Sequence, residues 1–253
     1  MESSKPFSIL GMHVNPTDYR RAVLQIQDWA RRAESRYVCF ATVNNVMESC
    51  DSQDFRQVMN EADLVTADGM PLVWAMRLLG HRSATRVYGP DLTPLVFEMA
   101  ERERIPVGFY GGSPAVLDRL VSVAHSRFPR LLVRYAYSPP YRALSEDEDT
   151  QVVSAIEQSQ IRILFVGLNT PKQDVWMSLH RGRVTCVMLG IGAAFDFLAG
   201  AKRQAPRWLM PLGLEWLFRL CTEPRRLWKR YLKHNPRFIA LFGAQLLGGR
   251  TQR

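Results

Sequence analysis

The sequence predicts an α/β fold: a Rossmann-like, mostly parallel sheet with helices on both faces, followed by a helical C-terminal appendage. Short apolar runs alternate with amphipathic helical patterns over the first 199 residues. Three of these runs (VGFY, ILFVG and CVMLG) are almost continuously apolar, as expected for strands covered on both faces. The alternation stops near Gly200, which marks the start of the appendage.

Seven strands are predicted from their β-branched and aromatic content. In chain order they are Val38–Val43, Asp63–Thr66, Arg86–Tyr88, Val107–Tyr110, Leu131–Tyr135, Ile161–Val166 and Val184–Leu189. Helical periodicity predicts helices over Asp18–Arg32, Ser52–Glu61, Pro71–Leu79, Leu92–Arg104, Ala115–Arg127 and Glu146–Gln158. Ser113-Pro114 and Ser145 supply N-caps for the last two.

The segment from residue 200 onward contains no strand pattern. We expect helices broken by prolines at 206, 211, 224 and 236. The domain boundary is therefore predicted near 197–205, which gives an α/β domain over 1–199 and an appendage over 200–253.

The positive charge of the chain is concentrated in this appendage. Residues 200–253 hold 12 of the 33 Lys and Arg but only two acids, Glu215 and Glu223, whereas residues 1–199 are close to neutral. Tryptophans and leucines are interleaved with the cations. Basic and aromatic residues on one stretch suit a lipid headgroup layer better than a nucleic-acid duplex.

Cysteine usage and hydropathy narrow the class further. The four cysteines lie far apart with no CxxC or Cys/His cluster, which predicts free thiols, buried or half-buried, in a reducing compartment and no structural zinc. The N-terminal residues lack the pattern of a secretion signal, and no run approaches the roughly 18 apolar residues of a spanning helix. A membrane contact would therefore be a surface contact.

Ligands of open α/β sheets bind at the carboxyl ends of strands, so the loops after the strands are the candidate site. Thr42, Asn44 and Asn45 follow the first strand, where a hydrogen-bonding role and a helix cap are equally consistent with the pattern. Asp68 lies between a strand and the Gly-Met-Pro start of a helix. It is either a turn-forming residue or a carboxylate general base.

Three other loops carry weaker patterns. Gly111 and Gly112 precede a helix start that favours anions, but the GxGxxG fingerprint is absent. Lys172 and Gln173 open the helix after the ILFVG strand and either form a solvated first helical turn or bind a ligand. A cation at a helix N-terminus is unfavourable to the helix dipole, which favours the ligand role. Asp196 follows the last strand and is either a turn residue or a ligand-binding carboxylate.

Taken together, the loops resemble the WecG/TagA/CpsF family of bacterial glycosyltransferases. The matching segments are TVNNV (42–46), ADLVTADGMPLVW (62–74), RVYGPDL (86–92), FYGG (109–112), FVGLNTPKQDVW (165–176), GAAFDFLAG (192–200) and the long appendage segment 203–238. They run in order over nearly the whole chain. Asp174 stands where glutamate is usual, alanines replace frequent glycines in GIGAAFD, and Lys229 stands where arginine is common.

The resemblance implies transfer of a sugar from a UDP-sugar donor to a polyprenyl-diphosphate-linked acceptor, with inversion and with no essential metal or other cofactor. It implies that Asp68 is the catalytic base and that Thr42, Asn44, Arg86 and Gln173 belong to the active-site pocket. It further implies that Arg219, Arg226 and Lys229 or Arg230 form a basic motif that meets the membrane and helps to close the site. The expected location is cytoplasmic, on the inner face of the bacterial plasma membrane.

The expected mechanism is a single displacement at the anomeric carbon, in which Asp68 accepts the proton of an acceptor hydroxyl. Arg86 and the appendage arginines are candidates to meet the charge of the departing diphosphate. Two rival classes are a basic nucleic-acid-binding protein, for which no motif is present, and an NAD enzyme, for which the glycine fingerprint is missing. The identity of the transferred sugar stays open, because the family includes N-acetylmannosaminyl, N-acetylmannosaminuronyl and neutral hexosyl transfer. The oligomeric state also stays open between a monomer and a homo-oligomer.

Overall fold

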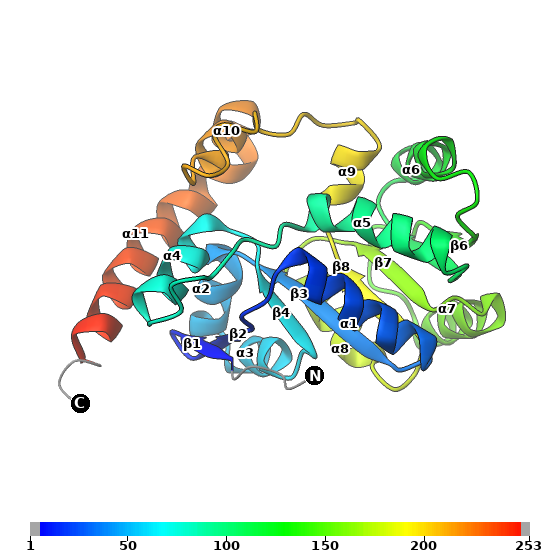
Figure 1. The fold of residues 1–253 in the computed structure, drawn as a ribbon, viewed down its shortest axis with the longest axis horizontal. Helices are drawn as coiled ribbons and strands as arrows, with labels where there is room; N and C mark the ends of the chain where they lie inside the picture. Colours follow the sequence, from blue (N-terminus) through cyan, green and yellow to red (C-terminus); the bar gives the residue numbers. More distant parts are fainter. Residues whose placement is uncertain (1–5, 249–253) are drawn as a thin grey trace. The chain divides into compact units, whose positions relative to one another are not determined.

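The main sheet has the predicted parallel architecture. The computed structural model describes residues 6–248. Six strands lie in the order β4–β3–β8–β7–β5–β6 (Figure 1). They are β3 (Arg36–Ala41), β4 (Leu64–Ala67), β5 (Val107–Gly111), β6 (Val133–Tyr137), β7 (Ile163–Gly167) and β8 (Val187–Gly190). All pairs from β3 to β6 across the sheet are parallel, which confirms the α/β fold.

The chain forms two compact units. One, here called the sheet unit, comprises residues 19–39 and 89–203. Its helices are α1 (Tyr19–Arg31), α5 (Gly89–Arg102), α6 (Pro114–Arg127), α7 (Glu146–Ser159), α8 (Lys172–His180) and α9 (Ala194–Leu198). The other, here called the appendage unit, comprises residues 6–18 and 40–88 together with residues 204–248, here called the tail.

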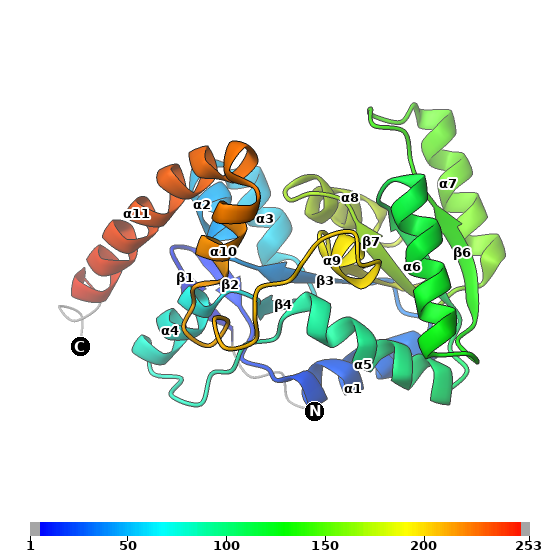
Figure 2. The same cartoon turned by 90° about the horizontal axis from the view of Figure 1, so that it is seen from above.

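Helices cover both faces of the sheet unit. The chain crosses the sheet in one direction from β5 through α6 to β6. It then crosses in the opposite direction, from β6 through α7 to β7 and from β7 through α8 to β8. Because parallel crossovers are right-handed, the two sets of helices must lie on opposite faces. Figure 2 accordingly shows α8 on one side of the strands and α1 and α5 on the other.

Phenylalanine rings pack against one another inside the sheet unit. Phe109 and Phe165 stack with ring centroids 5.6 Å apart, and Phe97 meets both rings edge-on. Gly167 ends β7 against Phe195, where an added Cβ would lie 2.3 Å from the ring. A larger residue there would displace a fully buried aromatic ring.

The appendage unit is built around a long C-terminal helix. It contains β1 (Phe7–Ile9), β2 (Met12–Val14), the last two residues of β3, β4, α2 (Val43–Asp51), α3 (Gln53–Asn60), α4 (Met70–Leu78), α10 (Glu215–Thr222) and α11 (Pro224–Gly248). α11 packs against α2 and α10 (Figures 1 and 2). Its buried residues are Leu227, His234, Phe238 and Phe242, whose spacing places them on one face of the helix.

Polar contacts fix α11 to the N-terminal part of its unit. Asp51 at the end of α2 accepts from Lys233 at 3.0 Å and from Arg237 at 2.7 Å. The amide of Gln245 bridges the β1–β2 hairpin, accepting from Leu10 N and donating to Ser8 O, both at 2.9 Å. The tail is therefore an integral part of this unit.

Three sequence predictions are wrong in detail. Arg86–Tyr88 is not a strand. Val87 N donates to Ala67 O at 3.0 Å, but Ala67 is the last residue of β4, and Val87 O accepts from the side chain of Thr66 at 3.2 Å instead of from a strand N–H. Val43 begins α2 and does not end a strand. Cys221 is exposed, whereas the other three thiols are buried or half-buried as predicted.

Pro236 also behaves differently from the prediction, because α11 continues through it. Proline cannot donate to the carbonyl of Leu232, four residues earlier. Leu232 is 69% exposed, so water can satisfy that carbonyl. The packing of the buried face of α11 on both sides of Pro236 then outweighs the lost hydrogen bond.

One buried carboxyl in the sheet unit is titratable near neutrality. Asp174 lies in the first turn of α8 and is fully buried. Burial raises the pKa of Asp174 from 3.8 to about 6, because the charged form loses its hydration. The folded state therefore favours the protonated carboxyl.

We predict that Asp174→Asn stabilises the protein at neutral pH and has little effect at pH 4. Because the pKa is raised in the folded state, the stability that Asp174 contributes is present below pH 3.8 and is lost as pH rises through about 6. The difference corresponds to about 3 kcal/mol at pH 7. Urea denaturation at pH 4, 5.5 and 7, with the exposed Asp118→Asn as control, measures it. A difference between wild type and Asp174→Asn that does not grow with pH would contradict the prediction.

Candidate active site

The appendage unit contains a cavity of about 570 Å³, within the size range of small-molecule sites. Its walls come from the start of α2, the loop before α4, the segment before α10, and the helices α10 and α11. Six of the predicted site residues line it: Thr42, Asn44, Asp68, Arg86, Arg219 and Arg230. The structure thus brings together strand-end residues and tail residues that are up to 188 positions apart in the chain.

The loop that carries Asp68 is held at the end of β3. The backbone N–H groups of Asp68 and Gly69 both donate to Ala41 O, at 2.9 and 3.3 Å. Gly69 also lies against Thr42, whose Cα would be 3.7 Å from an added Cβ. The carboxyl end of β4 and the start of α2 are therefore adjacent, as the parallel arrangement predicts.

Thr42 and Asn45 form the cap that one interpretation of the sequence predicted. Asn45 Oδ1 accepts from Thr42 N at 3.0 Å and from the Thr42 hydroxyl at 3.1 Å. Asn44, by contrast, lines the cavity, and its Oδ1 is buried with no hydrogen-bond partner among residues 6–248. An orphaned buried acceptor in a cavity wall is typical of a ligand contact.

Arg86 is tied to Asp68 and to the tail at once. Its Nε donates to Asp68 O, and its Nη2 donates to Glu215 Oε2 at 2.5 Å. The guanidinium also lies over the Tyr88 ring, 4.0 Å from the centroid, and Tyr88 donates to Glu215 Oε1 at 3.2 Å. The side chains of Arg86 and Glu215 are each only 15% exposed.

The charges of this group reinforce one another. Burial disfavours the charged guanidinium, but the carboxylates of Asp68 and Glu215 outweigh it and raise the pKa of Arg86. Burial also raises the pKa of Tyr88, so its hydroxyl stays protonated and can donate. Asp68 and Glu215 therefore share the charge of one arginine.

Two polar residues of α11 face the cavity one turn apart. Arg230 and His234 both line it, and Arg230 Nε and His234 Nδ1 are buried without a hydrogen-bond partner in the described part of the chain. Burial lowers the pKa of His234, aided by the charge of Lys233, so its imidazole is neutral at pH 7. Glu48 Oε1 lies 3.8 Å from His234 Nε2.

Two predicted tail residues lie outside the cavity lining. Arg226 is exposed and pairs with Glu223 at 2.6 Å. Lys229 is exposed and its Nζ lies 5.6 Å from the centroid of the Trp228 ring. Their positions suit a surface contact better than a contact in the cavity.

The other four predicted residues belong to the sheet unit. Gly112 N donates to Gly167 O at 3.0 Å, so this N–H is already used. Gly111 has a φ of +116° and packs so tightly on Gly167 that an added Cβ would lie 2.6 Å from its carbonyl oxygen. Both glycines thus have a structural function next to β7.

Gln173 and Asp196 are likewise engaged in local contacts. Gln173 is buried, and its Nε2 donates to Gly190 O at the end of β8 at 2.8 Å. Its Oε1 has no hydrogen-bond partner within residues 6–248 and remains a candidate ligand contact. Asp196 pairs with Lys202 at 2.8 Å.

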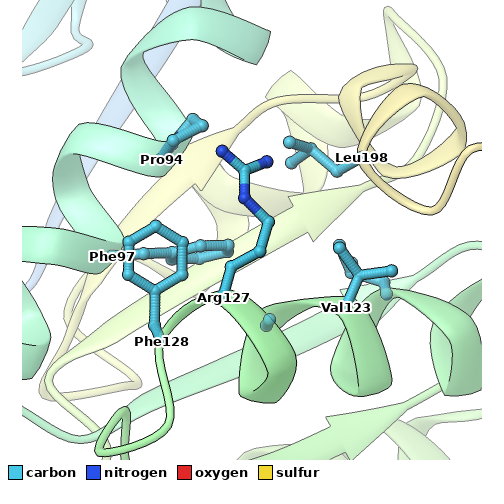
Figure 3. Close-up of a pocket in the computed structure, with 8 residues that line it drawn as sticks. Pro94, Phe97, Val123, Arg127, Phe128 and Leu198 are labelled. Carbon is cyan, nitrogen blue, oxygen red and sulfur yellow. The ribbon is translucent and has the colours of Figure 1, made fainter.

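A second void in the sheet unit is too small to be a site. Its volume is about 10 Å³, room for no more than one water. Figure 3 shows the residues that line this void, with the side chain of Arg127 beside Pro94, Phe97 and Leu198. This void is a packing defect of an apolar layer.

Residues 6–248 contain no group of three or more His, Cys, Asp or Glu placed to hold a metal ion. None of the helices in that range is long and apolar enough to cross a membrane.

Two cavity residues with distinctive environments, Glu215 and His234, are not predicted from the sequence. In the sequence, Glu215 is one of two acids in a basic segment, and no motif assigns a role to His234. An isolated acid within a strongly basic segment was the available signal, because a negative charge there needs a specific partner. For His234 no local signal exists, because its burial depends on α2.

Comparison with known proteins identifies the family of the chain. Residues 7–252 match the model of the glycosyl transferase WecG/TagA/CpsF family. The chain is 29% identical over 181 residues to the N-acetylglucosaminyldiphosphoundecaprenol N-acetyl-β-D-mannosaminyltransferase of Bacillus subtilis strain 168, covering 71% of this chain and 68% of that protein. It is 28% identical over 236 residues to the protein of the same name from Staphylococcus aureus strain NCTC 8325 / PS 47, covering 91% and 89%. The chain therefore belongs to the WecG/TagA/CpsF family of glycosyltransferases.

Proposed function

We propose that the chain transfers N-acetylmannosamine from its UDP derivative to N-acetylglucosamine linked to a polyprenyl diphosphate. The cavity that gathers Asp68 with cations of the tail is the observation that carries this proposal. The names of the relatives supply the transferred sugar and the acceptor. The UDP carrier comes from the resemblance to the family.

The proposed reaction is a single displacement with inversion. An acceptor hydroxyl attacks the anomeric carbon, its proton passes to the Asp68 carboxylate, and the bond from that carbon to the β-phosphate oxygen breaks. UDP leaves with the electron pair. In this proposal no metal ion takes part, so cationic side chains must stabilise the departing diphosphate.

Arg219 and Arg230 are the proposed cations for the leaving group. Both line the cavity with Asp68. Arg86 is less suited to that role than the sequence suggested, because Glu215 compensates much of its charge. Asn44, with its unpartnered Oδ1, is proposed to bind a hydroxyl or an amide N–H of the substrates.

The acceptor is a lipid, and we propose that α11 docks on the cytoplasmic face of the plasma membrane. Arg225, Trp228, Lys229, Leu232 and Ile239 are exposed and follow each other at helical spacing, so they form one strip of α11. Trp228, Leu232 and Ile239 are 48, 69 and 71% exposed. Cations beside large apolar side chains suit an anionic headgroup layer. Ile239 also lines the cavity, which places the strip next to the site.

Asp68→Asn is expected to lower kcat/KM by at least about 10²-fold, because the amide cannot accept the acceptor proton. UDP release with the lipid-linked acceptor measures the rate. Asp54→Asn, an exposed substitution in α3 of the same unit, is the control. Activity of Asp68→Asn within twofold of wild type, at an unchanged melting temperature, would remove Asp68 from the role of base.

Trp228→Ser combined with Leu232→Ser is expected to weaken binding to anionic phospholipid vesicles more than tenfold. Each buried side chain contributes about 1.5–3 kcal/mol to insertion. Because neither residue lines the cavity, transfer to a short-chain, water-soluble acceptor should be retained. Cosedimentation measures binding, and Leu24→Ser with Leu179→Ser, exposed in the sheet unit, is the matched control. Equal loss in both double variants would contradict docking through α11.

A further inference from the structure

Glu215 is the only acid of the tail that lines the cavity. It opens α10, where the positive end of the helix dipole favours a carboxylate. Its two oxygens have different partners: Oε2 accepts from Arg86 and Oε1 accepts from Tyr88. A carboxylate held at both oxygens and 15% exposed has a fixed position.

Arg86 connects the fixed carboxylate of Glu215 to the Asp68 loop. Its Nε donates to the backbone oxygen of Asp68, while its Nη2 is held by Glu215. The planar guanidinium stacked on Tyr88 restricts the remaining rotation. The link therefore runs from α10 through Arg86 to the loop that carries the proposed base.

The link also sets the electrostatic environment of that loop. The carboxylates of Asp68 and Glu215 both act on Arg86. The charge of Arg219 acts on Tyr88, and Arg230 and the neutral imidazole of His234 line the same cavity. Without the charge of Glu215, Asp68 would be the one carboxylate among the described lining residues, in a cavity that also holds Arg86, Arg219 and Arg230. Uncompensated positive charge makes a carboxylate a weaker base.

We propose that Glu215 is a positioning residue for the transfer reaction: through Arg86 it orients the Asp68 loop and preserves the basicity of the Asp68 carboxylate. This inference rests on the proposed role of Asp68 as base. It gives the appendage a second task besides meeting the substrate diphosphate. Glu215 does not itself touch the reacting atoms in this proposal.

The test is the pH profile of kcat/KM for Glu215→Gln, measured by UDP release with the full-length protein. Glutamine keeps an acceptor for Arg86 but removes the negative charge. We expect kcat/KM to fall at least tenfold and the acidic limb of the profile to move down by about one pH unit, because the charge of Arg86 is no longer shared. A lower rate with an unmoved limb would overturn the proposal, since a purely structural role has that effect.

Glu215→Asp tests position without loss of charge. A carboxylate drawn back by one methylene cannot reach both Arg86 and Tyr88, so kcat should fall several-fold while the acidic limb stays in place. A wild-type kcat in this variant would overturn the positioning role, also where Glu215→Gln is too unstable to assay. Glu223→Gln, whose exposed partner is Arg226, is the control and should keep the wild-type rate and limb.

The outcomes separate this proposal from the proposed function. Absence of transfer by the wild-type protein, or full activity of Asp68→Asn, would reject the function itself. Transfer that depends on Asp68 but is indifferent to Glu215→Gln and Glu215→Asp would reject only the role of Glu215.

Discussion

The ion pair between Arg86 and Glu215 is the interaction on which the candidate site depends. Both side chains are largely buried, and a buried charge without its partner is strongly destabilising. The pair joins two segments that lie 129 positions apart in the chain. Because Arg86 also donates a hydrogen bond to the backbone carbonyl oxygen of Asp68, the position of the proposed base depends on a residue of the tail.

The cavity combines engaged and unengaged polar groups in a way that suits a binding site. Arg86, Glu215 and Tyr88 satisfy one another. Asn44 Oδ1, Arg230 Nε and His234 Nδ1, in contrast, are buried without hydrogen-bond partners in the described residues. Folding stability alone would not retain such groups, since each costs about 1–3 kcal/mol. A polar substrate that pairs with them offsets that cost.

The sequence predicts local features well and long-range ones poorly. The apolar runs of β5, β7 and β8 and the Asp68-Gly-Met-Pro turn depend on neighbouring residues, and they lie close to where they were expected. The prediction of a strand at Arg86–Tyr88 is wrong, because a strand needs a neighbouring strand to pair with and the neighbouring β4 already ends at Ala67. Glu215 and His234 could not be assigned, because their environments come from Arg86, Tyr88 and α2. Pro236 did not break α11, because packing on α2 overrides local propensity.

Whether the tail is a working part of the transfer site is tested most directly by a double-mutant cycle on kcat/KM with Arg86→Gln, Glu215→Gln and the double variant. Residues that act as one unit give non-additive effects. If Arg86 and Glu215 act as one link to Asp68, the kcat/KM of the double variant should be no lower than that of the less active single variant. Multiplicative losses, with the double variant slower by the product of the two single effects, would show that the two residues act independently and would contradict the link.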